Sequence, residues 1–222
     1  MFFSGLVWKL AGLLGAVLQI LLIGILLKGP YRKYPVLFLY VIIAFLINVV
    51  ESAEYWKLIE WSAFGVRLYW TNEMIFQVLV FATVISLIYR ASIDSSARTV
   101  TARMLILGAF VVMGLSIILP YSAVSFNRWM TGATRNLSFA SAILNLLLWG
   151  RLVAQKGRDP ELLMISGAFG LQTAGKAIGH SLRVLGLNWL GNPIIPITYL
   201  LSLLILWRGF RRRLETVQPR VP

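Results

Sequence analysis

The chain of 222 residues contains no cysteine and a single histidine, His180. The absence of thiols excludes disulfide bonds, cysteine nucleophiles, iron–sulfur clusters and cysteine-ligated zinc. One imidazole excludes a haem or metal centre that is held by several histidines of this chain. We therefore expect no metal site and no cofactor.

Charge is also scarce, because only 13% of the residues are charged while 59% are apolar. An ordinary soluble domain has about 25% charged and about 45–50% apolar residues. This composition excludes a soluble globular enzyme, which could not bury so much apolar surface, and it excludes a disordered chain, whose hallmark is low hydrophobicity. An integral membrane protein is the class that fits.

Seven stretches reach the roughly 20 predominantly apolar residues that a bilayer-spanning helix needs. They cover residues 5–27, 35–52, 70–90, 104–123, 137–154, 162–186 and 193–210. We expect an all-α fold in which residues 1–210 form one seven-helix transmembrane bundle and residues 211–222 form a short basic tail. The first stretch has no basic segment before it and no small-residue cleavage site, so it is expected to be a retained span.

The orientation follows from the basic residues, since Lys and Arg in short loops stay in the cytoplasm. Fourteen of the 21 Lys and Arg residues lie in the first, third and fifth loops, in the tail or at the span ends beside them, and five lie toward the other side. We expect the N-terminus outside and the C-terminus in the cytoplasm, in a bacterial inner membrane. The net charge of +13 then reflects orientation. The bilayer is the expected partner, and nucleic acid is not.

Spans one to three weakly resemble spans five to seven. The first and fifth spans each end in a Lys-Gly pair, at Lys28 and Lys156, and a proline then opens the next helix, at Pro35 and Pro160. Superposing the two prolines aligns Asn48 with Thr173, Glu51 with Lys176, and Tyr55 with His180. The fourth span would link two parallel three-helix units. Chance similarity between apolar helices is the alternative explanation.

This 3+1+3 plan, with seven spans and the N-terminus outside, resembles the architecture of the SWEET sugar transporters and their PQ-loop relatives. The Pro-Gln pair that gives the latter family its name is missing from the spans. The resemblance implies a solute site at the interface between the two units.

A polar stripe runs along the sixth span. Four residues follow one another at spacings of four, four and three: Gln172, Lys176, His180 and Arg183. They fall within an arc of about 80° on a helix. Gly175 and Gly179 lie at the edge of the stripe and permit close approach of another helix, so the stripe should face the bundle. Ionisable residues at membrane depth indicate function by default.

Opposite charges lie at similar depth on the second and third spans. Glu51 shares a helix face with Asn48 and Tyr55, and Gln77 lies one turn deeper than Glu73. We predict that Lys176 or His180 pairs with Glu51 or Glu73 in an outward-facing cavity between the second, third and sixth spans. The candidate ligand-binding residues are Asn48, Glu51, Tyr55, Glu73, Gln77, Gln172, Lys176, His180 and Arg183. The alternative is a buried ion pair that fixes helix packing.

Three functions fit these features. The first is binding or transport of a small solute through the cavity. The second is a non-catalytic subunit or sensor component that works with a partner membrane protein or a second copy. The third is an intramembrane hydrolase that uses His180 and the carboxylates, but the glycine–serine pattern of such enzymes is incomplete around Ser116 and Ser181. We assign no catalytic residue and favour the first function.

Overall fold

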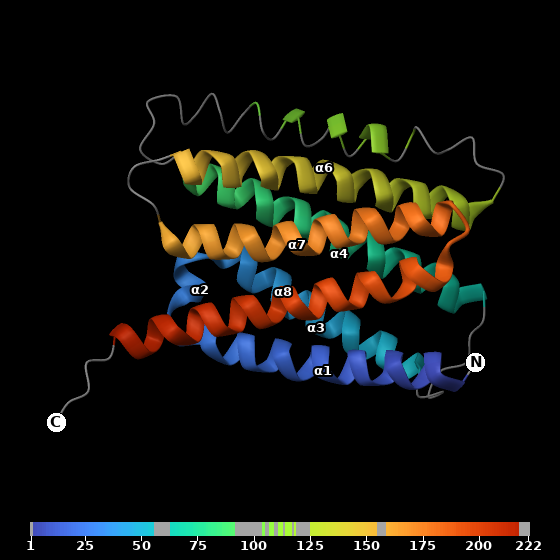
Figure 1. The fold of residues 1–222 in the computed structure, drawn as a ribbon, viewed down its shortest axis with the longest axis horizontal. Coiled ribbons are helices and arrows are strands. Elements are labelled where there is room, and N and C mark those ends of the chain that lie inside the picture. The colour runs from blue at the N-terminus through green and yellow to red at the C-terminus, as the bar shows by residue number, and fades with distance from the viewer. Residues whose placement is uncertain are drawn as a thin grey trace.

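The computed structural model describes residues 2–55, 63–91, 125–154 and 159–217, with nine separate positions between 104 and 118. Helices and the turns between them account for all of these residues, which confirms the all-α prediction (Figure 1). The helices with defined bounds are α1 (Phe2–Leu27), α2 (Pro30–Lys33), α3 (Pro35–Tyr55), α4 (Ala63–Ala91), α6 (Phe126–Ala154), α7 (Pro160–Val184) and α8 (Asn188–Val217).

Six of the predicted spans correspond to long helices, but several helices extend beyond the apolar stretch that predicted them. α4 begins seven residues before residue 70, α6 eleven before residue 137 and α8 five before residue 193. A hydropathy pattern detects only the apolar part of a helix, whereas backbone hydrogen bonds continue into polar segments. The nine described positions within the fourth span, 104–123, are helical. The rest of that span lies outside the described residues, so the number of seven spans stays a prediction.

Among the described residues, four helices are long and apolar enough to cross a membrane, and they indicate an integral membrane protein. The candidate spanning segments are Leu10–Leu27, Pro35–Ala53, Gly65–Ala91 and Asn188–Arg213. α6 and α7 have 29 and 25 residues, or about 44 and about 38 Å at 1.5 Å per residue. Their outer faces are apolar, since Leu146, Leu147 and Ile178 are each more than half exposed. Polar residues on their inner faces lower the average hydropathy.

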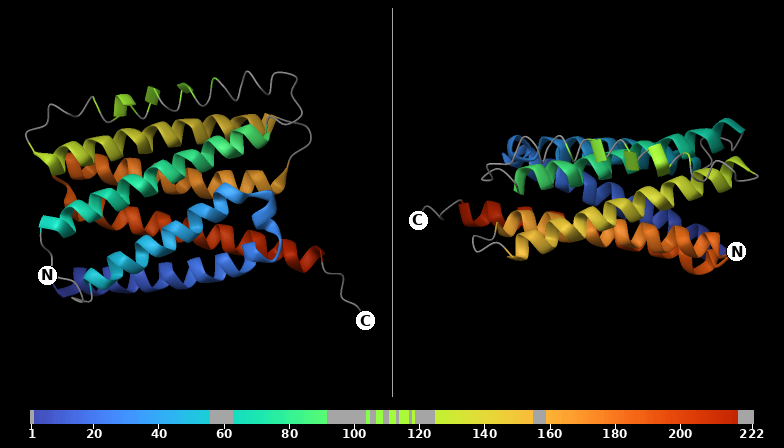
Figure 2. Two further views of the ribbon diagram at one scale, coloured as in Figure 1. Left: turned by 180° about the vertical axis from the view of Figure 1, so that it is seen from behind. Right: turned by 90° about the horizontal axis from the view of Figure 1, so that it is seen from above.

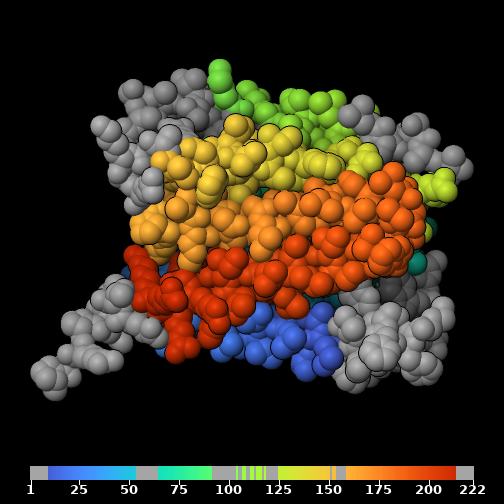
Figure 3. Space-filling model, viewed as in Figure 1, coloured from blue at the N-terminus to red at the C-terminus, as the bar shows by residue number. Residues whose placement is uncertain are grey.

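The long helices form a closed ring around a shared interior. In order, the neighbours are α1, α3, α4, α6, α7 and α8, and α8 packs against α1 to close the ring. α4 also contacts α7 across the interior. Figure 2 shows the same helices from behind and from above, lying lengthwise beside one another. Figure 3 shows α6, α7 and α8 packed closely along the face toward the viewer.

α7 and α8 approach each other closely along a face of small residues. A Cβ atom added to Gly175 would lie 2.1 Å from Thr198 Oγ1, and one added to Gly179 would lie 2.4 Å from Ile195 Cγ1. The two glycines therefore have the helix-packing role that their spacing predicted. Gly186, with φ +81°, ends α7 in a Schellman turn, in which the Leu187 amide donates to the Leu182 carbonyl at 2.9 Å.

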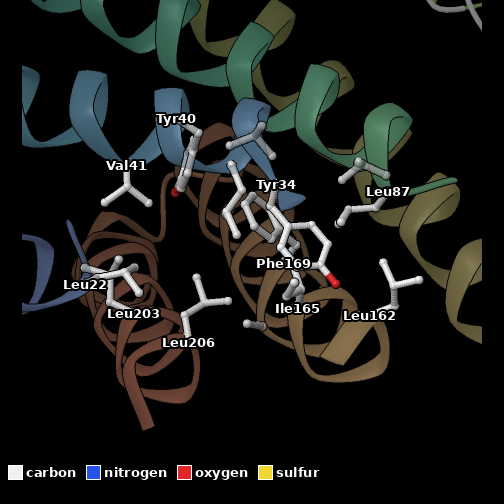
Figure 4. Packing of buried hydrophobic residues seen from close by; sticks show 14 of the residues in the cluster. Leu22, Tyr34, Tyr40, Val41, Leu87, Leu162, Ile165, Phe169, Leu203 and Leu206 are labelled. Carbon is white, nitrogen blue, oxygen red and sulfur yellow. The ribbon is translucent and has the colours of Figure 1, made fainter. Parts of the chain in front are cut away.

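The half of the ring remote from this turn is filled by apolar side chains. Tyr40 and Phe169 pack with ring centroids 5.1 Å apart, and the leucines of α1 and α8 surround them (Figure 4). Leu22, Leu26 and Leu206 in this cluster are fully buried. This part of the interior is therefore closed by packed side chains.

Beyond the apolar cluster, charged side chains meet at Glu161 near the start of α7. Its carboxylate accepts hydrogen bonds from Lys33 of α2, Arg213 of α8 and the hydroxyl of Tyr34. Arg90 of α4 stacks over the Tyr34 ring, with the guanidinium 4.7 Å from the ring centroid. Burial, reinforced by the Glu161 charge, raises the pKa of Tyr34, which therefore stays protonated as the donor. These contacts join four helix ends.

Candidate functional site

A buried ion pair links α4 and α7 across the interior of the ring. Lys176 Nζ lies 2.7 Å from Glu73 Oε1, and the two side chains are 6% and 14% exposed. The same ammonium lies 4.0 Å from the centroid of the Phe76 ring, a cation–π contact. This is one of the four pairings that the sequence allowed. Each charge compensates the other, because either alone would be costly at this burial.

His180 lies one turn further along α7 and faces the same carboxylate. Its Nε2 is 3.7 Å from Glu73 Oε1, which is too far for a hydrogen bond. Neither ring nitrogen has a hydrogen-bond partner among the described residues, although the side chain is only 1% exposed. A buried polar group without a partner costs about 1–3 kcal/mol. His180 is therefore a polar group that the packing of the described residues leaves unsatisfied.

Arg183 completes the cationic side of α7 near the turn into α8. Its Nε donates to Asn192 Oδ1 at 2.9 Å, and the side chain is half-buried. The helical spacing of Lys176, His180 and Arg183 places three nitrogen-bearing side chains on one face. That face points into the ring, as the stripe of polar residues predicted.

A cavity of about 430 Å³ lies in front of this face, toward the end of the ring that holds the α7–α8 turn. Ligand pockets typically measure about 300–1,000 Å³. α1, α3, α4, α7 and α8 all contribute to the walls. The polar residues that line the cavity are Asn48, Glu51, Ser52, Tyr69, Glu73, Lys176, His180, Arg183, Asn192 and Tyr199.

Six of the nine candidate ligand-binding residues come together in this cavity. They are Asn48, Glu51, Glu73, Lys176, His180 and Arg183. That these residues bind a ligand stays a prediction.

Two of the other three candidates, Gln172 and Gln77, lie elsewhere. Gln172 is buried deeper, where its Oε1 accepts hydrogen bonds from Tyr40 at 3.0 Å and Ser202 at 3.3 Å. It therefore links α7 to α3 and α8. Gln77 is fully buried and its amide has no hydrogen-bond partner among the described residues. The side chain of Tyr55 lies outside the described part of the structure.

The sequence did not predict the walls that α1 and α8 supply. Asn48 Nδ2 donates to Gln19 Oε1 at 2.9 Å, and Gln19 Nε2 donates to the Tyr199 hydroxyl at 2.6 Å. A chain of hydrogen bonds thus joins α3, α1 and α8 along one wall. Gly12 and Gly15 make room for it, since a Cβ added to Gly15 would lie 3.0 Å from Asn48 Nδ2. Gln19, a polar residue in the middle of α1, is the feature of the sequence that could have indicated this wall.

The two serines near His180 and on the cavity wall form hydrogen bonds within their own helices. Ser181, the serine next to His180, donates its hydroxyl to the Ala177 carbonyl at 2.7 Å, so it serves its own helix. Ser52, on the cavity wall, donates to Asn48 Oδ1 at 3.3 Å. Within the part of the chain that the structure describes, no group of three or more His, Asp or Glu side chains is placed to hold a metal ion.

Comparisons with protein-family models, with curated proteins and with solved structures find no match to this chain. The residues and their geometry are therefore the basis for assigning a function.

Proposed function

We propose that this chain is a seven-helix membrane protein that binds a small solute in the cavity and carries it across the membrane. The observation that carries this proposal is the cavity of about 430 Å³ beside the Lys176–Glu73 pair, which charged side chains of three helices line. A purely structural ion pair between Lys176 and Glu73 needs no cavity beside it. A polar ligand would fill this cavity and contact the charged side chains that line it.

The proposed topology places the N-terminus outside and the C-terminus in the cytoplasm, with α6, α7 and residues 104–123 as further spans. The lengths of α6 and α7 and their apolar outer faces support this topology. The end that carries Lys33, Arg90 and Arg213 is the cytoplasmic one, as expected for basic residues. The cavity then belongs to the outer half of the bundle.

The proposal divides the ring into two parallel three-helix units. One is α1, α3 and α4 and the other is α6, α7 and α8, and the three helices of each unit are consecutive around the ring. The ion pair joins the two units, because Glu73 belongs to the first and Lys176 to the second. Solute sites of transporters built from repeats lie at such an interface.

Alternating access needs a closed gate at the end of the ring opposite the cavity, and the contacts of Glu161 provide one. Lys33 follows the first helix of the first unit, whereas Glu161 and Arg213 belong to the second unit. This network and the apolar cluster close the cytoplasmic side in the present conformation. Rocking of one unit against the other would open that side by separating Lys33 from Glu161.

The test is solute uptake into vesicles that contain the purified protein, with a panel of labelled amino acids, sugars, carboxylates and amines. We expect the wild-type protein and an Arg67→Gln variant to take up the same solute, because Arg67 is exposed and does not line the cavity. Glu51→Gln and Lys176→Met should reduce that uptake. Undiminished uptake by both cavity variants, or no uptake of any solute in the panel, would overturn the proposal.

A further inference from the structure

The charged side chains that line the cavity come from three helices. α7 presents the cations Lys176 and Arg183, with His180 between them. α3 and α4 present the carboxylates Glu51 and Glu73, and Glu73 contacts Lys176 at 2.7 Å. The described lining residues thus contain two permanent positive and two negative charges, and their charges are balanced.

The walls from α1, α3 and α8 also carry apolar side chains. Ala11 of α1, Ala44 and Ile47 of α3, and Ile195 and Leu200 of α8 line the cavity together with Asn48 and Tyr199. An apolar side chain of a ligand would be removed from water against them. The cavity therefore combines cations, carboxylates and apolar surface within about 430 Å³.

Charge balance restricts the ligands that such a cavity accepts. A ligand of single charge would leave a net charge in a cavity of low dielectric constant, where an uncompensated charge is costly. A zwitterion or an uncharged solute would leave none, and only the zwitterion has two charged ends that match the α7 cations and the carboxylates of α3 and α4.

We propose that the ligand is a small zwitterion of the amino-acid class, with its carboxylate against Arg183, its ammonium toward Glu51, and its apolar side chain against the apolar residues of α1 and α8. This inference rests on the proposed function and specifies its substrate class. It takes the Lys176–Glu73 pair as a fixed part of the wall.

The test compares four probes of nearly the same shape by calorimetry on the purified protein in detergent. Leucine carries both charges, 4-methylpentanoate lacks the ammonium, and leucinamide and 3-methylbutylamine lack the carboxylate. We expect leucine to bind about tenfold to hundredfold more tightly than each of the others, because each lost charge removes one charge-assisted interaction.

Two variants test which side chain of the cavity contacts each charged end of the ligand. Glu51→Gln should reduce the advantage of leucine over 4-methylpentanoate, and Arg183→Met should reduce its advantage over 3-methylbutylamine. Arg67→Met is the matched control, since it removes an exposed arginine of α4 that does not line the cavity. It should bind all four probes as the wild-type protein does.

The outcomes separate this inference from the proposed function. Equal or tighter binding of a singly charged probe would overturn the zwitterion inference and leave the solute cavity standing. Binding of none of the four probes, with uptake from the wider panel only of a sugar, a carboxylate or an amine, would do the same. Binding of none, together with no uptake of any solute, would overturn both.

Discussion

Removal of either partner of the Lys176–Glu73 pair should destabilise the protein far more than removal of both. At 2.7 Å, two unit charges attract by about 6 kcal/mol when the effective dielectric constant is about 20. Desolvation offsets much of this attraction, but loss of one partner leaves the other buried and uncompensated at a cost of about 3–5 kcal/mol. Glu73→Gln should lie within that range, because it removes the carboxylate charge that lies 2.7 Å from the ammonium.

A double-mutant cycle measures this dependence. The variants are Glu73→Gln, Lys176→Met and the two combined, and reversible unfolding in mixed micelles is followed by circular dichroism. We expect the combined variant to lose much less than the sum of the single losses, with a coupling free energy of about 3 kcal/mol. A coupling below about 0.5 kcal/mol would show that the two charges do not depend on each other and would refute the reasoning.

Three further predictions concern helix packing, the remote charged network and topology. Gly175→Ala should lower the free energy of unfolding by about 1–3 kcal/mol, because its Cβ would overlap Thr198. Gly167→Ala, with no atom within 4 Å of its Cβ, should be neutral or stabilise the protein by up to about 1 kcal/mol. The thermal unfolding midpoints of both variants test this difference. Glu161→Gln should lower the midpoint by weakening contacts to three side chains, and an unchanged midpoint would contradict a joining role. In this cysteine-free chain, Ser4→Cys should react with an impermeant maleimide on intact cells and Arg220→Cys only after permeabilisation; the reverse pattern would invert the proposed topology.

The sequence alone was sufficient to identify the side of α7 that faces the interior. The spacing of Gln172, Lys176 and His180 fixed one face, and Gly175 and Gly179 beside it required a close neighbour. All five are buried in the structure. The local sequence is enough to identify this face, because helical periodicity depends only on residues three or four positions apart.

The walls contributed by α1 and α8 could not be predicted in the same way. They depend on closure of the ring, which brings the first and last helices together, and no local pattern encodes that contact. The start of α8 also differs from the predicted span 193–210. That span would begin at Pro193, with Pro196 in its first turn, but both prolines lie inside a helix that begins at Asn188. Pro196 lines the cavity and offers no amide to the carbonyl of Asn192.

The central claim is that the cavity opens to the outside and binds a solute, and a single cysteine at Ser52 tests it most directly. Ser52 lines the cavity, and the natural chain has no other thiol. We expect an impermeant maleimide to label Ser52→Cys on intact cells. A saturating transported solute should slow this labelling and leave the labelling of Arg67→Cys unaffected. Labelling of Ser52→Cys only after permeabilisation, or at a rate that no solute in the panel changes, would contradict it.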